Sequence, residues 1–228
     1  MIGIIGAMAH EVEVLKESMK INKVETHCGI EFYTGFIGEN EVTLTGCGVG
    51  KVNAAIAASI LIDSYKCNLV INTGIAGAIK GLKTRDVCIG TKLYYSDVDV
   101  TVFGYTKGQI PGLPECFAIN DGVLTSVKNV LDQLGISYNE TTIYTGDQFA
   151  SSKDILNGFE LTSPHIACEM EGTAIAHVCQ KSGVNFLVLR YISDIVGEES
   201  QVEDYNAFEF DMANRSSEIC FKLLNNLK

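Results

Sequence analysis

The chain has 228 residues, of which 46% are hydrophobic, and its 28 acidic and 17 basic residues give a formal net charge of -11. This length and apolar content suit one α/β domain with a large core, whereas the acidic balance and the scattered lysines make nucleic acid and anionic membrane surfaces unexpected partners. No apolar run approaches the roughly 18 residues that a membrane-spanning helix requires.

The N-terminal stretch MIGIIGAMAHEVEV is apolar until it reaches His10, Glu11 and Glu13, and it has no positively charged leader. We therefore interpret residues 2–7 as a buried first strand and not as a signal peptide. The eight cysteines include no C-x-x-C pair, and several stand inside apolar runs. Such cysteines are typical of reduced core thiols, so we expect a cytoplasmic protein.

The first half of the chain alternates between strand and helix patterns. Apolar residues at helical spacing predict a helix near residues 9–20, and a hairpin follows with strands over 29–37 and 41–46. The glycine-rich stretch GCGVGK then opens a second helix. Residues 68–74, NLVINTG, form the continuous apolar run that is typical of a buried parallel strand.

The second half continues this alternation around one long irregular excursion, residues 97–117, and loops of this length in compact domains are usually functional or disordered. We expect a helix capped by Asp121 and stopped by Gly135. The other expected elements are strands over 86–95, 141–149 and 185–196, a helix over 171–183, and a C-terminal amphipathic helix. No linker or internal repeat interrupts the series. The sequence therefore predicts a single α/β domain over residues 1–228 with a mixed, mostly parallel sheet.

Common catalytic motifs are missing from the sequence. GCGVGK fits neither the Rossmann spacing G-x-G-x-x-G nor a Walker loop, which leaves either a tight turn before a helix or a ligand contact through the backbone. The histidines at positions 10, 27, 165 and 177 have no second His or Cys at metal-ligand spacing, so we expect no metal. No G-x-S-x-G elbow is present for serine-hydrolase chemistry.

Three carboxylates stand at unusual places. Glu11 follows the first strand at the start of a helix, where the helix dipole favours an acid, and Glu171 lies at a strand-to-helix junction, where it could also be a cap. Asp194 is flanked by Ile192 and Ile195, and such apolar company raises the pKa of a carboxyl group. All three follow predicted strands at the edge where open α/β sheets bind ligands, which favours a site over three separate caps.

At these residues the sequence resembles a known family. The stretches IGIIGAM, GVGKVNAA, NTGIAG, DVTVFGYTKGQIPG, GDQF, EMEGTAIAHVC and RYISD are similar, in order and spacing, to those of 5'-methylthioadenosine/S-adenosylhomocysteine nucleosidases in the purine nucleoside phosphorylase superfamily. The resemblance extends from Met1 to about Val196. It implies a three-layer α/β/α nucleoside phosphorylase/hydrolase fold and no cofactor. It also implies hydrolysis of the N-ribosidic bond of methylthioadenosine, S-adenosylhomocysteine and 5'-deoxyadenosine, which releases adenine.

The resemblance also assigns roles to residues. Asp194 would hydrogen-bond adenine and protonate its N7, Glu171 would hold the ribose hydroxyls of the developing sugar cation, and Glu11 would orient the attacking water near Arg190. Acid and base groups typically contribute on the order of 10²–10⁴ each to the rate. The other implied substrate contacts are Met170 under the sugar with Glu169 beside it, Phe149 and the backbone of Ala150 on adenine, Ser193 beside the acid, and Met8, Val49 and either Tyr205 or Phe208 around the 5' group.

Members of this family are dimers, and the long excursion closes the neighbour's pocket. The resemblance therefore implies a homodimer in which Val100, Phe103 and Pro111 meet the 5' group bound to the partner. This arrangement would give the irregular segment a function.

The sequence departs from the family pattern in three places. Ile75 replaces a serine that usually hydrogen-bonds the catalytic aspartate, so we expect Asp194 to be held less firmly or to have a higher pKa. Ala9 and His10 replace an acidic pair, which alters the charge near Glu11. Ala150 stands where a branched aliphatic residue is usual, which would loosen the adenine slot.

Several alternative functions remain. A phosphorylase of the same superfamily would hold phosphate with several arginines, but this chain has only Arg85, Arg190 and Arg215, and its first loop offers Glu11 instead. A nucleosidase for another substrate, such as futalosine or AMP, keeps the hydrolysis; an AMP enzyme would require cations at the 5' end. A nucleoside-binding protein without activity would not explain Glu11, Glu171 and Asp194 together.

Overall fold

The structure is a computed structural model that describes residues 1–226, apart from the side chains of residues 208 and 209. Its helices are α1 (His10–Glu17), α2 (Lys51–Asp63), α3 (Asp121–Gln133), α4 (Gly172–Ser182) and α5 (Gln201–Asn226), with two short 3-10 helices, η1 (Thr101–Phe103) and η2 (Lys153–Leu156). Its strands are β1 (Ile2–Gly6), β2 (Lys20–His27), β3 (Ile30–Ile37), β4 (Asn40–Gly46), β5 (Leu69–Lys80), β6 (Val87–Tyr95), β7 (Phe117–Ala118), β8 (Asn139–Thr145), β9 (Ile166–Glu169) and β10 (Asn185–Ile195).

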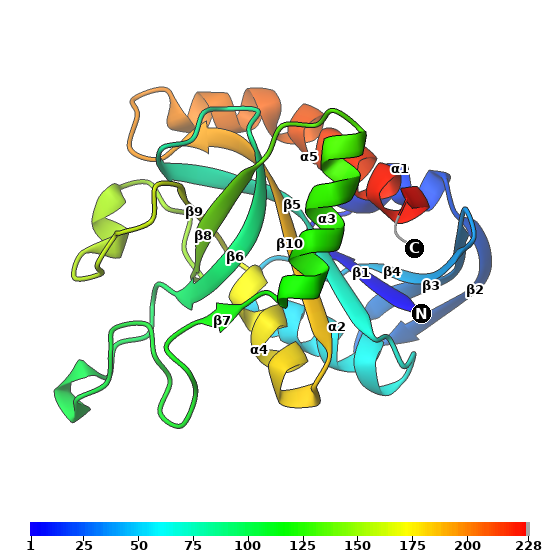
Figure 1. Ribbon diagram of the computed structural model, residues 1–228, viewed down its shortest axis with the longest axis horizontal. Helices are drawn as coiled ribbons and strands as arrows, with labels where there is room; N and C mark the ends of the chain where they lie inside the picture. Colours follow the sequence, from blue (N-terminus) through cyan, green and yellow to red (C-terminus); the bar gives the residue numbers. More distant parts are fainter. Residues whose placement is uncertain (227–228) are drawn as a thin grey trace.

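Helices cover both faces of one mixed sheet (Figure 1). On one face α1 packs against α5, which also contacts β5, β10 and α3. On the other face α2 packs against α4, and these two helices contact β1 and β10, respectively. The predicted three-layer α/β/α class is therefore confirmed. The many apolar residues at full burial, such as Ile71, Leu93 and Leu187, fill the space between the layers.

The sheet runs in the order β10-β6-β8-β9-β5-β1-β4-β3-β2, and β10 pairs again with β5. Five strands, β5, β10, β6, β8 and β9, are thus joined in a ring. The long strand β5 makes this possible because it pairs with β1 through Leu69–Asn72 and with β9 through Gly77–Lys80. Parallel pairs join β1 to β4 and β5, β5 to β10, and β8 to β6 and β9, while antiparallel pairs extend beyond the predicted hairpin.

Two local predictions are wrong. The helix predicted to reach residue 20 ends at Glu17, and the exposed edge strand β2 follows it. Most residues of β2 face solvent, so the strand has no alternating apolar pattern to reveal it. The cap of α3 is Asn120 and not Asp121, because the Asn120 side chain accepts hydrogen bonds from the backbone N–H groups of Gly122 and Val123 at 2.9 and 3.3 Å.

The cysteines and the helices agree with two further expectations. All eight cysteines are free, and Cys47, Cys67, Cys88, Cys168, Cys179 and Cys220 are buried. Burial raises the pKa of several of these thiols, that of Cys220 to about 12, which keeps them protonated and unreactive. Within residues 1–226, no helix combines the length and the apolar character needed to cross a membrane.

A glycine at the end of β1 lets α1 approach the sheet. A Cβ atom on Gly6 would lie 2.7 Å from Val12 Cγ1 and 3.1 Å from Glu11 Cβ, so a larger residue would push the helix away. Gly46 pairs directly with Gly6 across the β1–β4 ladder, but a Cβ atom there would meet its nearest neighbour at 3.7 Å, an ordinary contact.

We therefore expect Gly6→Ala to lower the free energy of unfolding by about 1–3 kcal/mol, the usual cost of overpacking. Gly46→Ala is the matched control and should have a much smaller effect, because its methyl group has room. Urea unfolding of both variants tests this. Equal losses of stability in the two variants would contradict the account of how β1 positions α1.

Candidate active site

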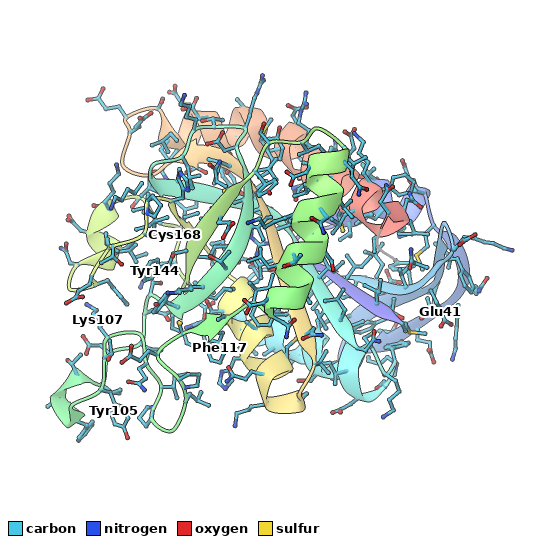
Figure 2. The ribbon with its side chains drawn as sticks, in the orientation of Figure 1. Glu41, Tyr105, Lys107, Phe117, Tyr144 and Cys168 are labelled. Atoms are coloured by element: carbon cyan, nitrogen blue, oxygen red, sulfur yellow. The ribbon has the colours of Figure 1, made fainter. Side chains whose placement is uncertain are left out.

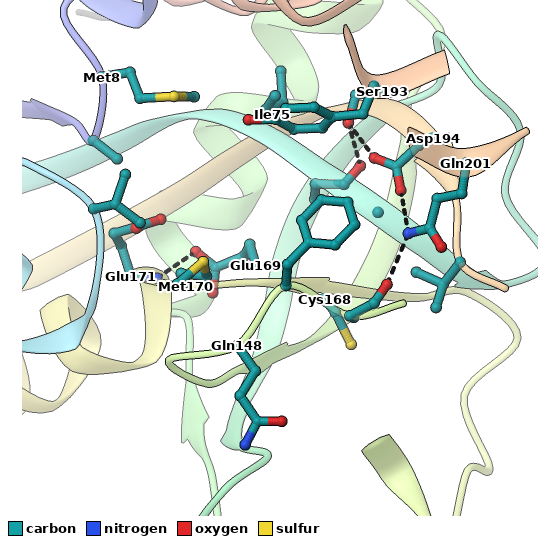
Figure 3. Close-up of a pocket in the computed structure, with 18 of the residues that line it drawn as sticks. Met8, Ile75, Gln148, Cys168, Glu169, Met170, Glu171, Ser193, Asp194 and Gln201 are labelled. Carbon is teal, nitrogen blue, oxygen red and sulfur yellow. Dashed lines mark hydrogen bonds between the residues drawn. The ribbon is translucent and has the colours of Figure 1, made fainter. Parts of the chain in front are cut away.

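One pocket opens at the edge of the sheet where the parallel strands β1, β8 and β10 finish and where β5 continues past its pairing with β1 (Figure 3). Its walls come from segments that are far apart in the sequence, as expected for the carboxyl edge of an α/β sheet. The lining residues are Ala7, Met8, Glu11, Val49, Ile75, Ala76, Gly77, Gln148, Phe149, Ala150, Cys168, Glu169, Met170, Glu171, Ser193, Asp194, Val196, Gln201 and Tyr205.

Glu11 is buried at the floor of this pocket, with 3% of its surface exposed. Its Oε2 atom accepts hydrogen bonds from the backbone N–H groups of Ala7 and Met8 at 2.7 and 2.9 Å, and Oε1 accepts one from Ile75 N–H at 3.2 Å. Burial raises the pKa of Glu11, while the charge of Arg190 and these backbone donors oppose that rise. The carboxyl group is therefore fixed in one orientation by the segment after β1 and by the middle of β5.

Residues 72–74 of β5 (NTG) and helix α5 also hold Glu11 in place. A side chain at Gly74 would collide with the Glu11 carboxyl group, so this strand position has to be glycine. Ser216 of α5 accepts a hydrogen bond from Gly74 N–H at 3.1 Å and lies 2.8 Å from the hydroxyl group of Thr73. Ser217 donates a hydrogen bond to the backbone carbonyl of Glu11. The last helix therefore holds the first one at the site.

Glu169 and Arg190 form a buried ion pair beneath the pocket. The guanidinium of Arg190 donates to Glu169 Oε2 and to Asn72 Oδ1, and Arg190 is 2% exposed. Glu169 Oε2 also accepts from the N–H groups of Glu171 and Gly172 at 3.0 and 2.7 Å, which caps α4. The alternative interpretation of Glu171 as a cap is therefore wrong, because Glu171 makes no capping hydrogen bond of its own and Glu169 supplies this cap.

Glu171 faces the pocket beside this pair. Its Oε1 accepts a hydrogen bond from Gly50 N–H at 2.9 Å, and its Oε2 lies 3.9 Å from the guanidinium of Arg190. Burial and the charge of Glu169 raise the pKa of Glu171 to about 8, against the opposing charge of Arg190. The guanidinium of Arg190 also interacts with Glu11, so three buried glutamates share one positive charge.

Carboxylates also hold the glycine-rich GCGVGK stretch in place. Gly50 N–H donates to Glu171, and Lys51 N–H donates to Asp147 Oδ1 at 2.8 Å. The ammonium of Lys51 lies 2.7 Å from Asp97. Amides that already bind carboxylates are not available to a phosphate, so the tight-turn interpretation of this stretch is the better one.

Asp194 lies at the opposite wall, where two side chains hold its carboxyl group (Figure 3). Ser193 donates to Oδ1 at 2.6 Å, and the amide of Gln201 donates to Oδ2 at 2.8 Å. Burial raises the pKa of Asp194, and the two donors partly offset this effect. Ile75 also lines the pocket without supplying a hydroxyl group, but Asp194 is not left without partners.

Apolar side chains surround the rest of the pocket. The rings of Phe149 and Tyr205 are 5.4 Å apart and nearly perpendicular, at 83°. Phe149 and Val49 are each 47% exposed, so their surfaces are open to a ligand. Met8 and Met170 add flexible thioether groups on two sides of the same space (Figure 3).

The structure brings together most of the residues that the sequence indicated. Those that line the pocket are Met8, Glu11, Val49, Ile75, Phe149, Ala150, Glu169, Met170, Glu171, Ser193, Asp194 and Tyr205. Arg190 lies beneath the pocket floor and touches it only through its partners. The side chain of Phe208 lies outside the described part of the structure. Val100, Phe103 and Pro111 belong to the excursion and do not line this pocket.

Sequence analysis missed Gln201, Ser216 and Asn72. Gln201 follows the region of family resemblance, and a single glutamine in an acidic loop gives no motif. Ser216 stands within an amphipathic helix, where serine is common on exposed faces. Asn72 lies within NTGIAG, so that motif was the one signal that could have indicated it. Among the described residues, no group of three His, Cys, Asp or Glu side chains could hold a metal ion.

Comparison with known proteins agrees with this geometry. The family model described as "Phosphorylase superfamily" matches residues 1–225. A curated 5'-methylthioadenosine/S-adenosylhomocysteine nucleosidase from Staphylococcus carnosus is 38% identical over 229 residues, which cover 100% of both chains.

Solved structures give the same result. An S-adenosylhomocysteine nucleosidase from Streptococcus pyogenes, in complex with 5-methylthiotubericidin, superimposes with a TM-score of 0.92 at 33% identity over 100% of this chain and 97% of that one. The futalosine hydrolase of Helicobacter pylori superimposes with a TM-score of 0.91 at 29% identity over 99% and 97%. The chain therefore belongs to the phosphorylase superfamily and, within it, to the 5'-methylthioadenosine/S-adenosylhomocysteine nucleosidases.

Proposed function

We propose that the protein hydrolyses the N-ribosidic bond of 5'-methylthioadenosine and S-adenosylhomocysteine, and also that of 5'-deoxyadenosine, releasing adenine and the 5'-modified ribose. The convergence of Glu11, Glu171 and Asp194 on one pocket carries this conclusion. The chain acts as one domain, residues 1–228, since the pocket and its supports extend from Ala7 to Ser217. The eight free thiols support a cytoplasmic location.

In this reaction Asp194 acts as the general acid. Its raised pKa favours the protonated form that can deliver a proton to N7 of the departing adenine. Ser193 and Gln201 stabilise the carboxylate that remains after the transfer. Phe149 offers a ring against the base, and the backbone of Ala150 offers hydrogen bonds to its edge.

Glu171 and Glu11 act on the ribose. As the bond breaks, positive charge develops on the sugar, and the net negative charge that Glu11, Glu169 and Glu171 keep around Arg190 is preorganised to stabilise it. Glu171 is placed to hold the ribose hydroxyl groups, with Met170 packed beside them. Glu11 is oriented by three backbone donors and can accept the proton of an attacking water.

The charges around the pocket favour water over phosphate as the nucleophile. Arg190 is already engaged by Glu169 and Asn72, and Arg215 lies on the surface in an ion pair with Asp211. A phosphate in the pocket would face the carboxyl groups of Glu11, Glu169, Glu171 and Asp194. The apolar side chains around the 5' side likewise favour a thioether or methyl group over a phosphate.

Adenine release in phosphate-free buffer tests the proposal. We expect methylthioadenosine and S-adenosylhomocysteine to release adenine at full rate without phosphate, and inosine and futalosine to react slowly. Absorbance and chromatography of the free base measure the rate. Activity that requires added phosphate would show that the protein is a phosphorylase and not a hydrolase. A preference for futalosine would contradict the proposed substrates.

Asp194→Asn is the matched variant for the same assay. The amide keeps the size and the hydrogen bonding of the side chain but cannot act as an acid, so turnover should fall by at least about 10²-fold. Binding of a non-hydrolysable adenosine analogue should stay within a few-fold of wild type. Near-normal turnover in this variant would contradict the assignment of Asp194 as the general acid.

The shared charge of the glutamates also predicts a dependence of stability on pH. Glu171 has a folded-state pKa of about 8, raised from 4.5, so the folded protein binds its proton more tightly than the unfolded chain does. This contribution to stability is full below about pH 4.5 and is lost as the pH rises toward 8.

We therefore expect Glu171→Gln not to show this decrease in stability at higher pH. Between about pH 5 and pH 8 its free energy of unfolding should rise relative to wild type by on the order of a few kcal/mol. Urea unfolding at several pH values measures the slope. Glu17→Gln on the exposed face of α1 is the control and should follow wild type. Parallel slopes for wild type and Glu171→Gln would contradict the shared-charge account.

The excursion between β6 and β7 supports a homodimer. It projects from the molecule, with Tyr105 near its far end (Figure 2). Val102 and Phe103 are 85% and 76% exposed, and neighbouring large apolar side chains at such exposure are typical of an interface. In the proposed dimer, Val100, Phe103 and Pro111 close the 5' side of the partner's pocket.

We expect Phe103→Glu to shift the dimer toward monomer and to raise KM for methylthioadenosine, because it places a charge in an apolar contact. Analytical ultracentrifugation and steady-state kinetics measure the two effects. Val24→Glu on the exposed strand β2 is the control and should change neither. A wild-type chain that sediments as a monomer at micromolar concentration would contradict the dimer.

A further inference from the structure

Gln201 is the first residue of α5 and is 4% exposed. Its Nε2 atom donates to Asp194 Oδ2 at 2.8 Å and to the backbone carbonyl of Ala150 at 2.7 Å (Figure 3). Its Oε1 atom accepts from Gly197 N–H at 2.9 Å. One side-chain amide therefore joins three segments of the pocket: the end of β10, the segment after β8, and the start of the last helix.

These contacts give the amide a fixed direction. Gly197 N–H occupies the oxygen of the amide, so the nitrogen must face Asp194 and Ala150. A donor at Oδ2 and the Ser193 hydroxyl at Oδ1 together hold both oxygens of the Asp194 carboxyl group. On the β5 side, Ile75, Ala76 and Gly77 line the pocket without offering a polar side chain. Gln201 thus takes a place that no side chain of β5 fills.

We propose that Gln201 is the positioning residue of the catalytic acid: its amide sets the orientation of Asp194 and ties it to the Ala150 segment that contacts the base. The inference rests on the proposed function, in which Asp194 protonates the leaving purine. A carboxyl group that transfers a proton must lie within hydrogen-bond reach of the accepting atom, and a fixed geometry of acid and base segment secures that distance.

The charges that face Asp194 come from several elements. Asp204 of α5 acts on it by repulsion, and Cys168 of β9 interacts with it across the pocket. Glu11, Glu169 and Glu171 line the same pocket above Arg190. Among these groups, Gln201 and Ser193 are the side chains that donate hydrogen bonds to Asp194, so they favour its ionised form after proton transfer.

Gln201→Met keeps the length of the side chain and removes the donor. We expect kcat to fall about tenfold and the alkaline limb of the pH–kcat profile to move up by about one pH unit, since a hydrogen bond to a charged group contributes about that much. KM should stay within a few-fold, because the ring of Phe149 and the ribose contacts remain.

Gln201→Glu is the second variant. A carboxyl group beside Asp194 adds a like charge, so the alkaline limb should move further up than in Gln201→Met. Val202→Met changes the neighbouring residue of the same helical turn, is 59% exposed in the wild type, and should leave both kcat and the profile unchanged.

The outcomes separate three explanations. A lower kcat with a shifted limb in both Gln201 variants supports the positioning role. A lower kcat with an unmoved limb overturns it in favour of a structural role. If Gln201→Met is unfolded at the assay temperature, as thermal melting would show, an unmoved limb in Gln201→Glu overturns it in the same way. Wild-type kcat with a lower KM overturns it in favour of an amide that the substrate displaces. Activity in Asp194→Asn would instead refute the proposed function.

Discussion

Arg190 stands in the middle of β10 with its guanidinium among three buried glutamates, and its positive charge acts on Glu11, Glu169 and Glu171 together. Removing ions from water costs several kcal/mol each, so such a cluster forms only where pairing and hydrogen bonds offset the cost. Here β10, β9 and β5 must lie side by side for Arg190 to reach Glu169 and Asn72. The ring of strands and the ion pair therefore depend on each other.

Because of this cluster, the carboxyl groups on the two sides of the pocket have different surroundings. Burial and the charge of Glu169 raise the pKa of Glu171, because one guanidinium cannot neutralise three buried carboxylates, and Glu169 takes the ion pair and most of the hydrogen bonds. Asp194 lies on the other wall, where burial and two hydrogen-bond donors set its pKa. The sugar and the base would thus meet carboxyl groups of different character, as reactions with one acid and one charge-stabilising group require.

The sequence allowed the α/β class, most elements and the main carboxylates to be predicted, because carboxylates after buried strands meet at one edge of such a sheet. The resemblance assigned the ribose to Glu171, but the spacing of Glu169 and Glu171 did not reveal that the Glu169 side chain turns back to cap α4. Strand β2 was missed for lack of an apolar face. Gln201 could not be found, because its own segment carries no motif and only the fold brings its amide between Asp194 and the distant carbonyl of Ala150. Hydrogen bonds between remote segments are properties of the tertiary fold.

The supports of the site come largely from the last helix. Gln201 reaches Asp194, while Ser216 and Ser217 reach Gly74 and the backbone of Glu11, a residue near the opposite end of the chain. Because synthesis proceeds from the N-terminus, all of α5 is made after Glu11 and Asp194. Backbone donors from Ala7, Met8 and Ile75 can therefore hold Glu11 before α5 forms, whereas the amide at Asp194 and the serine at the Glu11 carbonyl are added together when α5 docks.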